Sequence, residues 1–192
     1  MPLLILGLLM FIGMHSLRIF APDWRNRQVA RLGGGRWKGI FALVSLVGLV
    51  LIILGFGQAR LQPVLLYVPL PALRDLNILL TLAGSILICA AYVPRNHLRQ
   101  AIGHPMLAGV SLWAFGHLLV TGMVHDVVLF VPFLLWAATD FITARRRDQA
   151  AGTRYPAGTL QGDVLALVIG IVTWVAVAFW LHRLLIGISP LA

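Results

Sequence analysis

The sequence predicts an all-α fold, a polytopic transmembrane helix bundle with about six spans. Hydrophobic residues make up 60% of the 192 residues and charged residues only 11%, whereas a soluble domain carries about 25% charged residues. Several apolar runs approach the roughly 20 residues that a helix needs to cross the hydrocarbon of a bilayer. These observations indicate an integral membrane protein, and we expect residues 1–192 to form a single membrane domain.

The first apolar run, MPLLILGLLMFIGMHSLRIF, differs from a secretory signal peptide. It lacks a basic segment before the apolar residues and a small-residue cleavage site, and its positive charge follows the run. We therefore expect it to be a retained first span. The six expected spans cover residues 2–20, 39–57, 76–93, 105–124, 127–144 and 163–186.

The basic residues fall in the connections or at span ends, and six spans divide them unequally between the two sides. One side receives Arg18, Arg25, Arg27, Arg31, Arg36, Lys38, Arg95, Arg99, Arg145, Arg146, Arg147 and Arg154. The other side receives Arg60, Arg74 and Arg183. Loops rich in Lys and Arg stay in the cytoplasm, so both termini are expected on the non-cytoplasmic side. The net charge of +9 then reflects topology and attraction to anionic lipids, and nucleic-acid binding is not expected.

Two connections have a distinctive composition. Residues 21–38 form a basic cytoplasmic loop in which Gly33, Gly34 and Gly35 are expected to interrupt any helix. No strand precedes this glycine run and no Lys-Ser/Thr pair follows it, so a flexible turn is favoured over a phosphate-binding loop. Residues 58–75 are apolar but contain three prolines, which disfavours a continuous span and places the segment at the outer interface.

Four ionisable residues fall inside or at the ends of the expected spans: His15, His104, His117 and Asp140. Such groups are costly in hydrocarbon and usually face the bundle interior. Histidine is a common metal ligand, although a single interior histidine is more often a hydrogen-bonded core residue. On an ideal helix His104 and His117 are about 20 Å apart along the axis and about 140° apart around it. They cannot bind one ion by themselves, and a second ligand must come from another span.

The depth of each residue in its span suggests which side chains meet. His15, Arg18, His104 and Asp140 are all expected near the cytoplasmic end of the bundle, whereas His117 lies near mid-membrane with Trp113 one turn away. A bis-histidine iron site between His15 and His104 is compatible with this layer. Arg18 would then pair with a haem propionate, and Asp140 would orient a ligand histidine. The alternative is an ion pair between Arg18 and Asp140, with both histidines hydrogen-bonded locally.

The remaining histidines and the single cysteine give weaker signals. His97, His125 and His182 are expected to face solvent or lipid head groups, and His125 beside Asp126 is a candidate outer metal or proton site. One cysteine, Cys89, excludes an internal disulfide and any multi-cysteine metal site.

Three segments together resemble the NnrU family of small bacterial integral membrane proteins. They are FIGMHSLR at 11–18, GHPMLAGVSLWAFGHLL at 103–119 and VHDVVLFVPFLLWAATD at 124–140. The matching motif residues are His15, Ser16 and Arg18, then His104 and Pro105, then Trp113 and His117. One position departs from the pattern, because Gly103 stands where an Arg commonly precedes the His-Pro pair; Arg99 lies one turn earlier. The resemblance covers nearly the whole chain.

The resemblance implies a multi-pass protein of the bacterial inner membrane, linked to denitrification and to nitrite and nitric oxide respiration. The family is similar to the plastid zeta-carotene isomerases, membrane enzymes that bind haem b through histidines and require reduced iron. That similarity implies haem b as the cofactor here, without transferring the isomerase reaction. It also leaves the ligands open, because relatives use a ligand from the following span, where this chain offers only His125.

Four functions remain open at this stage. The first is a haem-binding membrane protein of nitrogen-oxide respiration that acts as redox partner, sensor or assembly factor, with respiratory or denitrification proteins as partners. The second is a haem-dependent isomerase of a polyene or isoprenoid lipid. The third is a small membrane methyltransferase, which the absence of any Glu in the chain disfavours. The fourth is a structural bundle whose histidines only pack.

Overall fold

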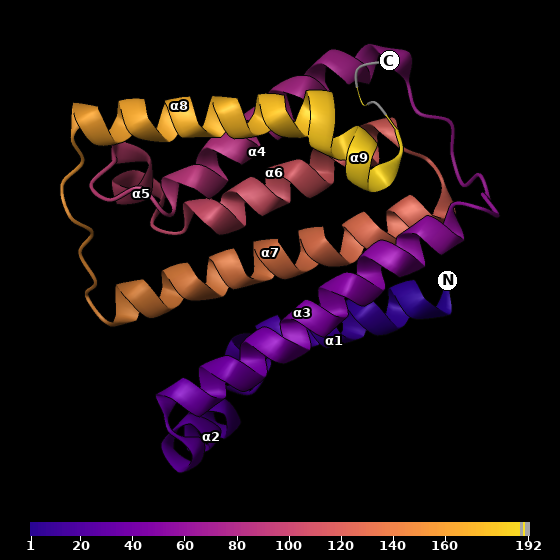
Figure 1. Ribbon diagram of the computed structural model, residues 1–192. Coiled ribbons are helices and arrows are strands. Elements are labelled where there is room, and N and C mark those ends of the chain that lie inside the picture. Colours follow the sequence, from indigo (N-terminus) through magenta and orange to yellow (C-terminus); the bar gives the residue numbers. More distant parts are fainter. Residues whose placement is uncertain (189, 191–192) are drawn as a thin grey trace.

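The computed structural model describes residues 1–188 and 190, and this part of the chain folds as helices without a β-strand (Figure 1). In chain order the elements are α1 (Pro2–Phe20), α2 (Pro22–Leu32), α3 (Gly34–Ala59), η1 (Pro71–Leu73), α4 (Arg74–Ala90), α5 (His97–Ile102), α6 (Pro105–Val120), α7 (Val124–Ala150), α8 (Leu160–Ala176), η2 (Val177–Leu181) and α9 (His182–Ile186). The all-helical prediction is therefore confirmed.

Five helical stretches are long and apolar enough to cross a membrane: Pro2–Phe20, Gly34–Ala59, Pro71–Ala90, Val124–Ala150 and Leu160–Ile186. The sixth expected span corresponds to α6, which is apolar but has only 16 residues. Large apolar side chains point outward along these helices; Leu43, Leu79 and Leu135 are each 63% exposed. Apolar surface on this scale requires contact with lipid, so the helices indicate a multi-pass membrane protein.

The expectation that residues 21–38 form a loop interrupted by glycines is wrong in part. Residues 22–32 form α2, with Pro22 at its first position, where a missing backbone N–H costs nothing. Gly33 ends this helix with φ of +81°, a conformation that suits glycine. Gly34 and Gly35, in contrast, are the first residues of α3. Only one of the three glycines therefore breaks the helix.

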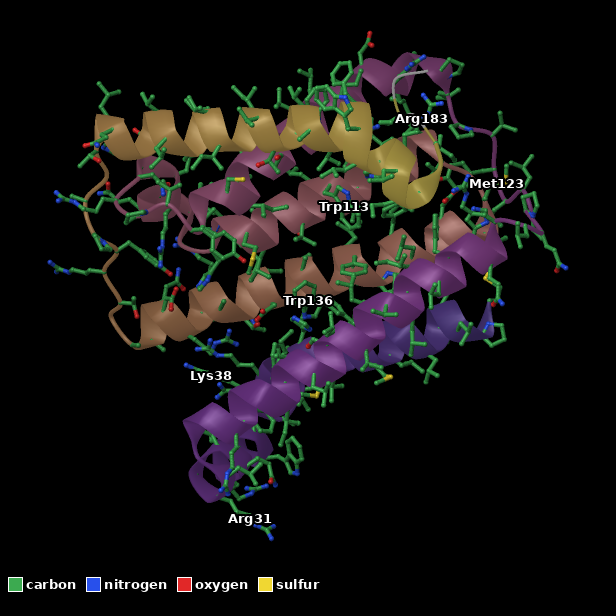
Figure 2. The ribbon with its side chains drawn as sticks, in the orientation of Figure 1. Arg31, Lys38, Trp113, Met123, Trp136 and Arg183 are labelled. Carbon is green, nitrogen blue, oxygen red and sulfur yellow. The ribbon has the colours of Figure 1, made fainter. Side chains whose placement is uncertain are left out.

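The long helices pack as a row in the order α3, α1, α7, α6, α4, α8, each in contact with the next (Figure 1). Along the helix axes, the N-terminus and α9 lie at one end of the bundle, and α2 and α5 lie at the other. Figure 2 shows Arg31 and Lys38 at the end with α2, and Met123 and Arg183 at the opposite end. The basic connections thus gather at one end of the bundle.

Glycines allow neighbouring helices to approach at backbone distance. A Cβ atom added at Gly55 would lie 2.2 Å from the backbone nitrogen of Leu4, and one at Gly7 would lie 2.6 Å from that of Ile52. Gly84 and Gly109 make the same kind of contact between α4 and α6. Lipid supplies no hydrophobic drive for helix association, so such close van der Waals contact stabilises membrane bundles.

The proline-containing segment 58–75 is not a continuous helix, as its composition predicted. α3 continues to Ala59 and η1 begins at Pro71, and the residues between them pack against the turn that joins α6 to α7. The backbone N–H of Leu66 donates to the carbonyl of Gly122 at 2.8 Å, and that of Val124 donates to Val64 at 2.9 Å. Backbone groups outside the helices are thereby satisfied within the protein.

Asn96 joins the end of α4 to α5 and is only 1% exposed. Its amide nitrogen donates to the carbonyl oxygens of Ala90, at 2.8 Å, and Val93, at 2.6 Å. Its side-chain oxygen accepts from the backbone N–H of Arg99 at 2.7 Å, which makes Asn96 the N-cap of α5. One side chain therefore satisfies two helix termini.

The last span contains a π-helical turn. α8 passes directly into η2, a π-helix of five residues, and η2 passes into α9, which begins at His182. Short π-helical turns inside α-helices are frequent at functional sites. Here the turn determines the direction in which His182 leaves the helix axis.

Gly55→Ala is expected to destabilise the protein by about 1–3 kcal/mol, because the new methyl group would overlap the backbone of α1. The thermal unfolding midpoint of the purified protein in detergent measures this loss. Gly57→Ala is the matched control, since a Cβ there meets nothing within 4 Å. Equal midpoints for the two variants would contradict the role given to the α1–α3 contact.

Asn96→Ala is expected to cost about 2–4 kcal/mol, because three hydrogen bonds to backbone groups are lost in a buried position. The exposed Asn26, which only accepts from Arg25, provides the control Asn26→Ala. Thermal unfolding of both variants, followed by circular dichroism, should show a clear loss only for Asn96→Ala.

Candidate functional site: a basic cavity at one end of the bundle

A cavity of about 480 Å³ lies at the end of the bundle where the basic connections gather, and we call it the basic cavity. Its lining comes from α1, α2, α3, α5, α6 and α7, together with the residue after α4 and the connection between α5 and α6. The lining residues are Met14, His15, Leu17, Arg18, Arg25, Trp37, Lys38, Phe41, Ala91, Arg99, Gly103, His104, Pro105, Met106, Leu107, Trp136, Asp140, Ala144 and Arg147.

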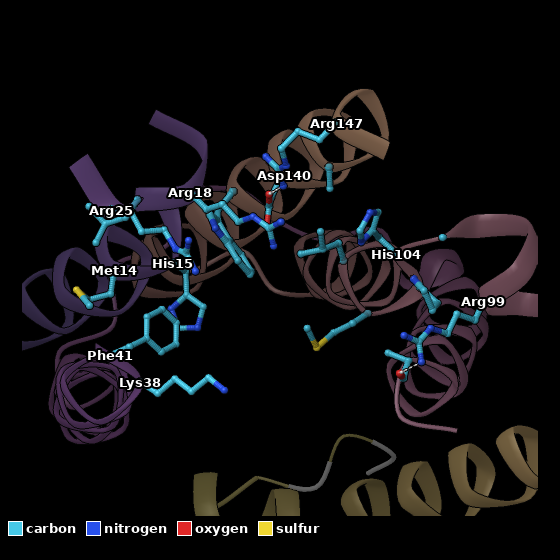
Figure 3. Close-up of a pocket in the computed structure, with 18 of the residues that line it drawn as sticks. Met14, His15, Arg18, Arg25, Lys38, Phe41, Arg99, His104, Asp140 and Arg147 are labelled. Carbon is cyan, nitrogen blue, oxygen red and sulfur yellow. Dashed lines mark hydrogen bonds and ion pairs between the residues drawn. The ribbon is translucent and has the colours of Figure 1, made fainter. Parts of the chain in front are cut away.

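Four of the five candidate binding residues line this cavity, namely His15, Arg18, His104 and Asp140. Figure 3 shows His15 on the side formed by α1 and α3, and His104 on the opposite side, with Asp140 of α7 between them. His117 lies elsewhere, in a second cavity. The four residues expected at one depth near the cytoplasmic end therefore lie around one cavity, and His117, which was expected deeper in the membrane, lies apart from them.

The His15 ring is held by its own helix and by aromatic neighbours. Its Nδ1 donates to the backbone carbonyl of Phe11 at 2.7 Å, and the ring stacks on the Phe11 ring with centroids 4.3 Å apart. Phe41 and Trp136 contact it edge-on. Nε2 then carries the free lone pair of the neutral imidazole, and it has no hydrogen-bond partner within residues 1–188 and 190. His15 is therefore oriented with one nitrogen available at the cavity.

The His104 ring is held by two residues that follow the fifth expected span. Its Nε2 lies 2.7 Å from Oδ2 of Asp148 and 3.3 Å from the Tyr155 hydroxyl. The Tyr155 hydroxyl also donates to the Asp148 carboxylate. With Nε2 bonded to a carboxylate, Nδ1 is the nitrogen available for a ligand. His104 sits at the N-cap of α6, so its backbone position is fixed by the start of that helix.

Asp148 and Tyr155 were not among the residues expected at the site. α7 continues to Ala150, beyond the expected span end at residue 144, and this extension carries Asp148 to His104. A signal was present in the sequence, because Asp140, Ala144 and Asp148 are four residues apart and so share one helix face. The charged residues after position 144 had been assigned to a connection.

Asp140 pairs with Arg147 of the same helix, with Arg147 Nη2 3.2 Å from Asp140 Oδ1. The alternative of an Arg18–Asp140 ion pair is therefore wrong, because two helical turns within α7 bring Arg147 to the carboxylate. The carboxylate that contacts a candidate ligand histidine is that of Asp148, which lies against His104, and not that of Asp140. Arg18 has no carboxylate partner in the described part of the chain.

Positive charge dominates the basic cavity. Five cationic side chains line it, Arg18, Arg25, Lys38, Arg99 and Arg147, against the single carboxylate of Asp140. Cations focused on a low-dielectric cleft attract anionic groups. The wall also includes Trp37, Phe41, Trp136 and several aliphatic side chains. The arrangement suits a molecule with an apolar body and negatively charged substituents.

Gly103, which stands where an Arg commonly precedes the His-Pro pair, is covered by the side chains of Tyr155 and Arg145. It has φ of +79°, and a Cβ there would lie 2.8 Å from the Tyr155 hydroxyl and 2.9 Å from an Arg145 guanidinium nitrogen. An Arg at this position would be strained by the backbone conformation. In this chain the guanidinium of Arg145 occupies the space beside position 103.

The other histidines differ in their surroundings. His97 is exposed, as expected, and its Nδ1 lies 2.6 Å from Oδ2 of Asp163. The expectation that His125 faces solvent or head groups is wrong: it is 5% exposed and packs on Phe56, because its helix start is covered by α3. Its Nε2 lies 3.5 Å from Asp126. His182 donates from Nδ1 to the carbonyl of Ile188 at 2.7 Å and lines the second cavity.

Comparison with known proteins adds one decisive finding. The family model described as NnrU protein matches residues 3–190, nearly the entire chain. The chain belongs to the NnrU family. No curated protein and no solved structure matches the sequence. The NnrU resemblance noted at His15, Arg18, His104 and His117 is thus confirmed for the family, and its motif histidines fall in two separate cavities.

The basic cavity of this NnrU protein can be tested against the cofactor that the resemblance implies. Within residues 1–188 and 190, no three His, Cys, Asp or Glu side chains cluster closely enough to hold a metal ion. A haem differs from a bare ion, because its porphyrin supplies the equatorial ligands and the protein needs only axial ones. Ligand histidines usually donate their second ring N–H to a carbonyl or carboxylate, and His15 and His104 each have such a partner. The residues present therefore fit haem.

The Tyr155 phenol is expected to titrate well above the ordinary tyrosine range. Burial, followed by its hydrogen bond to the Asp148 carboxylate, raises the pKa of Tyr155 to about 12. Burial and the hydrogen bond both favour the neutral phenol in the folded state, so their contribution to stability is fully present below the unfolded tyrosine pKa of about 10 and is lost as pH rises from 10 to 12.

Ultraviolet difference titration of wild type against Tyr155→Phe isolates this phenol from the other two tyrosines. Asp148→Asn should lower the Tyr155 pKa, since it removes the acceptor charge while the burial remains. An unchanged pKa in Asp148→Asn would contradict the Tyr155–Asp148 contact.

Proposed function

We propose that the basic cavity binds haem b, with His15 and His104 as axial ligands. The observation that carries this proposal is the pair of imidazoles on opposite sides of one cavity, each oriented by a protein acceptor (Figure 3). Nε2 of His15 and Nδ1 of His104 are the nitrogens left for iron. When bound, haem would supply a one-electron redox centre whose potential depends on its axial ligands.

The cationic side chains fit the two propionates of such a cofactor. Arg18 and Lys38 line the cavity beside His15 and have no carboxylate partner in the described part of the chain. Charge-assisted hydrogen bonds to carboxylates are the stronger kind, and a guanidinium can make two in parallel. The apolar wall of Phe41, Trp136 and Leu107 would contact the porphyrin faces. The volume of about 480 Å³ lies within the range of about 300–1,000 Å³ for cofactor sites.

Asp148 and Tyr155 would act as positioning residues. The Asp148 carboxylate fixes the tautomer of His104 by accepting from Nε2, and Tyr155 holds that carboxylate through its hydroxyl. Hydrogen bonding of this kind raises the basicity of a ligand histidine. His117 would then have a role apart from axial ligation, because it lines a different cavity.

We further propose six spans, with α6 as the short one and both termini on the non-cytoplasmic side of a bacterial inner membrane. α6 lies between α4 and α7 in the row of helices, and its apolar surface continues theirs. The connections that carry most Lys and Arg gather at the end with α2 and α5, which the positive-inside rule assigns to the cytoplasm. The basic cavity would then lie in the cytoplasmic half of the membrane.

Family membership supports a role in denitrification, and we propose that the haem serves nitrite and nitric oxide respiration as a redox, sensing or assembly component. Respiratory or denitrification proteins in the same membrane would be its partners. The cationic lining favours a haem-binding function over a methyltransferase, whose cosubstrate carries a positive sulfonium.

The full-length protein purified from haem-replete cells is expected to show a Soret band that shifts on reduction. His15→Ala and His104→Ala should each remove it, because an axial ligand is lost, while the exposed His97→Ala should retain it. Absorbance spectra of oxidised and dithionite-reduced protein provide the measurement. An intact spectrum in either ligand variant would remove that histidine from the proposal.

Two histidine–aspartate pairs with similar geometry permit a second test. Asp148→Asn is expected to weaken haem binding by about 10–100-fold, because it alters the partner of an axial ligand. Asp163→Asn alters the His97–Asp163 pair, outside the basic cavity, and should leave binding unchanged. Haem titration of apo-protein measures both. Equal affinities would show that Asp148 does not position a ligand.

A further inference from the structure

A second cavity, of about 260 Å³, lies between α4, α6 and the last span, and we call it the α4 cavity. It shares no lining residue with the basic cavity. Its lining residues are Asn77, Ile78, Thr81, Ser85, Ile88, Cys89, Trp113, His117, Thr173, Trp174, Val177, Ala178, His182 and Pro190. Neither the family nor the proposed haem site assigns a role to this space.

One wall of the α4 cavity is a polar stripe. Asn77, Thr81, Ser85 and Cys89 are spaced four residues apart on α4, which places them on one helix face. Polar groups at membrane depth are costly unless they are paired, so their partners are informative. Because this polar stripe lines the cavity between the helices, it faces the interior of the bundle and not the lipid.

Two hydroxyls of the stripe are paired within the protein. The Thr81 hydroxyl donates to the Asn77 carbonyl at 2.8 Å and accepts from the indole N–H of Trp174 at 3.1 Å. The Ser85 hydroxyl donates to the carbonyl of Gly170 at 2.9 Å. The Trp174–Thr81 and Ser85–Gly170 bonds join α4 to α8, and neither hydroxyl needs a ligand.

Two other polar atoms, one on His117 and one on His182, are hydrogen-bond acceptors without a donor in the described part of the chain. The unpaired side-chain oxygen of Asn77 is not a third, because it is closed off from the cavity and lies against Gly116 of α6, where an added Cβ would be 2.7 Å away. His117 donates from Nδ1 to the carbonyl of Trp113 at 2.8 Å, and His182 donates from Nδ1 to that of Ile188. In a neutral imidazole the other nitrogen, Nε2, is then an acceptor. Each ring is oriented by the backbone while its accepting nitrogen stays unpaired.

The occupant that fits these acceptors is a neutral molecule that brings its own donors. The remaining lining is apolar or aromatic, with Trp113 and Trp174 among it, and aromatic walls favour an aromatic ring. The volume is below the range of about 300–1,000 Å³ for drug-sized ligands, so it suits a single head group whose tail lies in lipid. A hydroxylated aromatic ring on an apolar chain satisfies each of these requirements.

We infer that the α4 cavity binds the head group of a lipid-soluble quinol, whose two hydroxyls donate to Nε2 of His117 and Nε2 of His182. The oxidised form of the same molecule, a quinone, has carbonyl oxygens that only accept hydrogen bonds. Its carbonyl oxygens would face the accepting Nε2 atoms of His117 and His182, with no hydrogen to form a bond between them. The site therefore selects the reduced form.

The test is equilibrium binding of decylubiquinol and decylubiquinone to the full-length protein in lipid nanodiscs without oxygen. Tryptophan fluorescence reports binding, since Trp113 and Trp174 line the cavity, and empty nanodiscs correct for partitioning into lipid. We expect decylubiquinol to bind at least about tenfold more tightly than decylubiquinone, because the quinone lacks two hydrogen bonds and each changes affinity by up to about that factor. Equal affinities, or tighter binding of the quinone, would overturn the inference.

Variants assign the acceptors. His117→Ala and His182→Ala should each lower quinol affinity by about tenfold and leave quinone affinity unchanged. Ser111→Ala is the matched control, because the Ser111 hydroxyl donates within α6 and lines neither cavity. Circular dichroism confirms that each variant is folded. Quinol affinity unchanged in both folded variants would overturn the assignment.

The quinol site and the haem site can fail separately. His15→Ala should remove the Soret band and leave quinol selectivity intact, whereas His117→Ala should do the reverse. Loss of quinol selectivity in His15→Ala would overturn the separation of the two sites, and an intact Soret band in that variant would count against the haem ligand alone.

Discussion

Backbone contact between neighbouring helices is the constraint on which the remaining structure depends. α1 and α3 meet at Gly7, Gly48 and Gly55, and α4 and α6 meet at Gly84 and Gly109, at distances that leave no room for a side chain. In lipid this contact replaces the hydrophobic drive that packs soluble helices. The helices that carry His15 and His104, α1 and α6, both pack against α7, so the separation of the two histidines depends on those two contacts.

Hydropathy predicted the apolar centre of each span well and the helix ends poorly. The first expected span, residues 2–20, coincides with α1, whereas α7 runs to Ala150 and α2 fills a segment expected to be a loop. The physical reason is that apolar composition marks the part of a helix in contact with lipid. Backbone hydrogen bonding continues past that boundary, where charged side chains such as Arg146 are exposed. The sequence therefore reports the membrane boundary and not the end of the helix.

The sequence likewise predicted which residues of the candidate site lie together but not the residues that they contact. Depth along each span placed His15, Arg18, His104 and Asp140 in one layer, and all four line one cavity. Their partners were not predicted, because partners depend on which helices are neighbours and how each is rotated. The contact of His104 with Asp148 requires α6 beside an extended α7, and the polar stripe at Asn77 gains meaning only when α6 and α8 flank α4.

The π-helical turn at Val177–Leu181 has a consequence for how the last span can vary. A π turn holds one more residue than the α turn it replaces, so everything after it is rotated about the axis by the angle of one residue, about 100°. His182 is the first residue beyond that turn. The direction in which this imidazole points therefore depends on the number of residues in the turn before it and not on which side chains they carry. Deleting one residue from this turn would rotate the side chain at position 182 by that angle without any substitution.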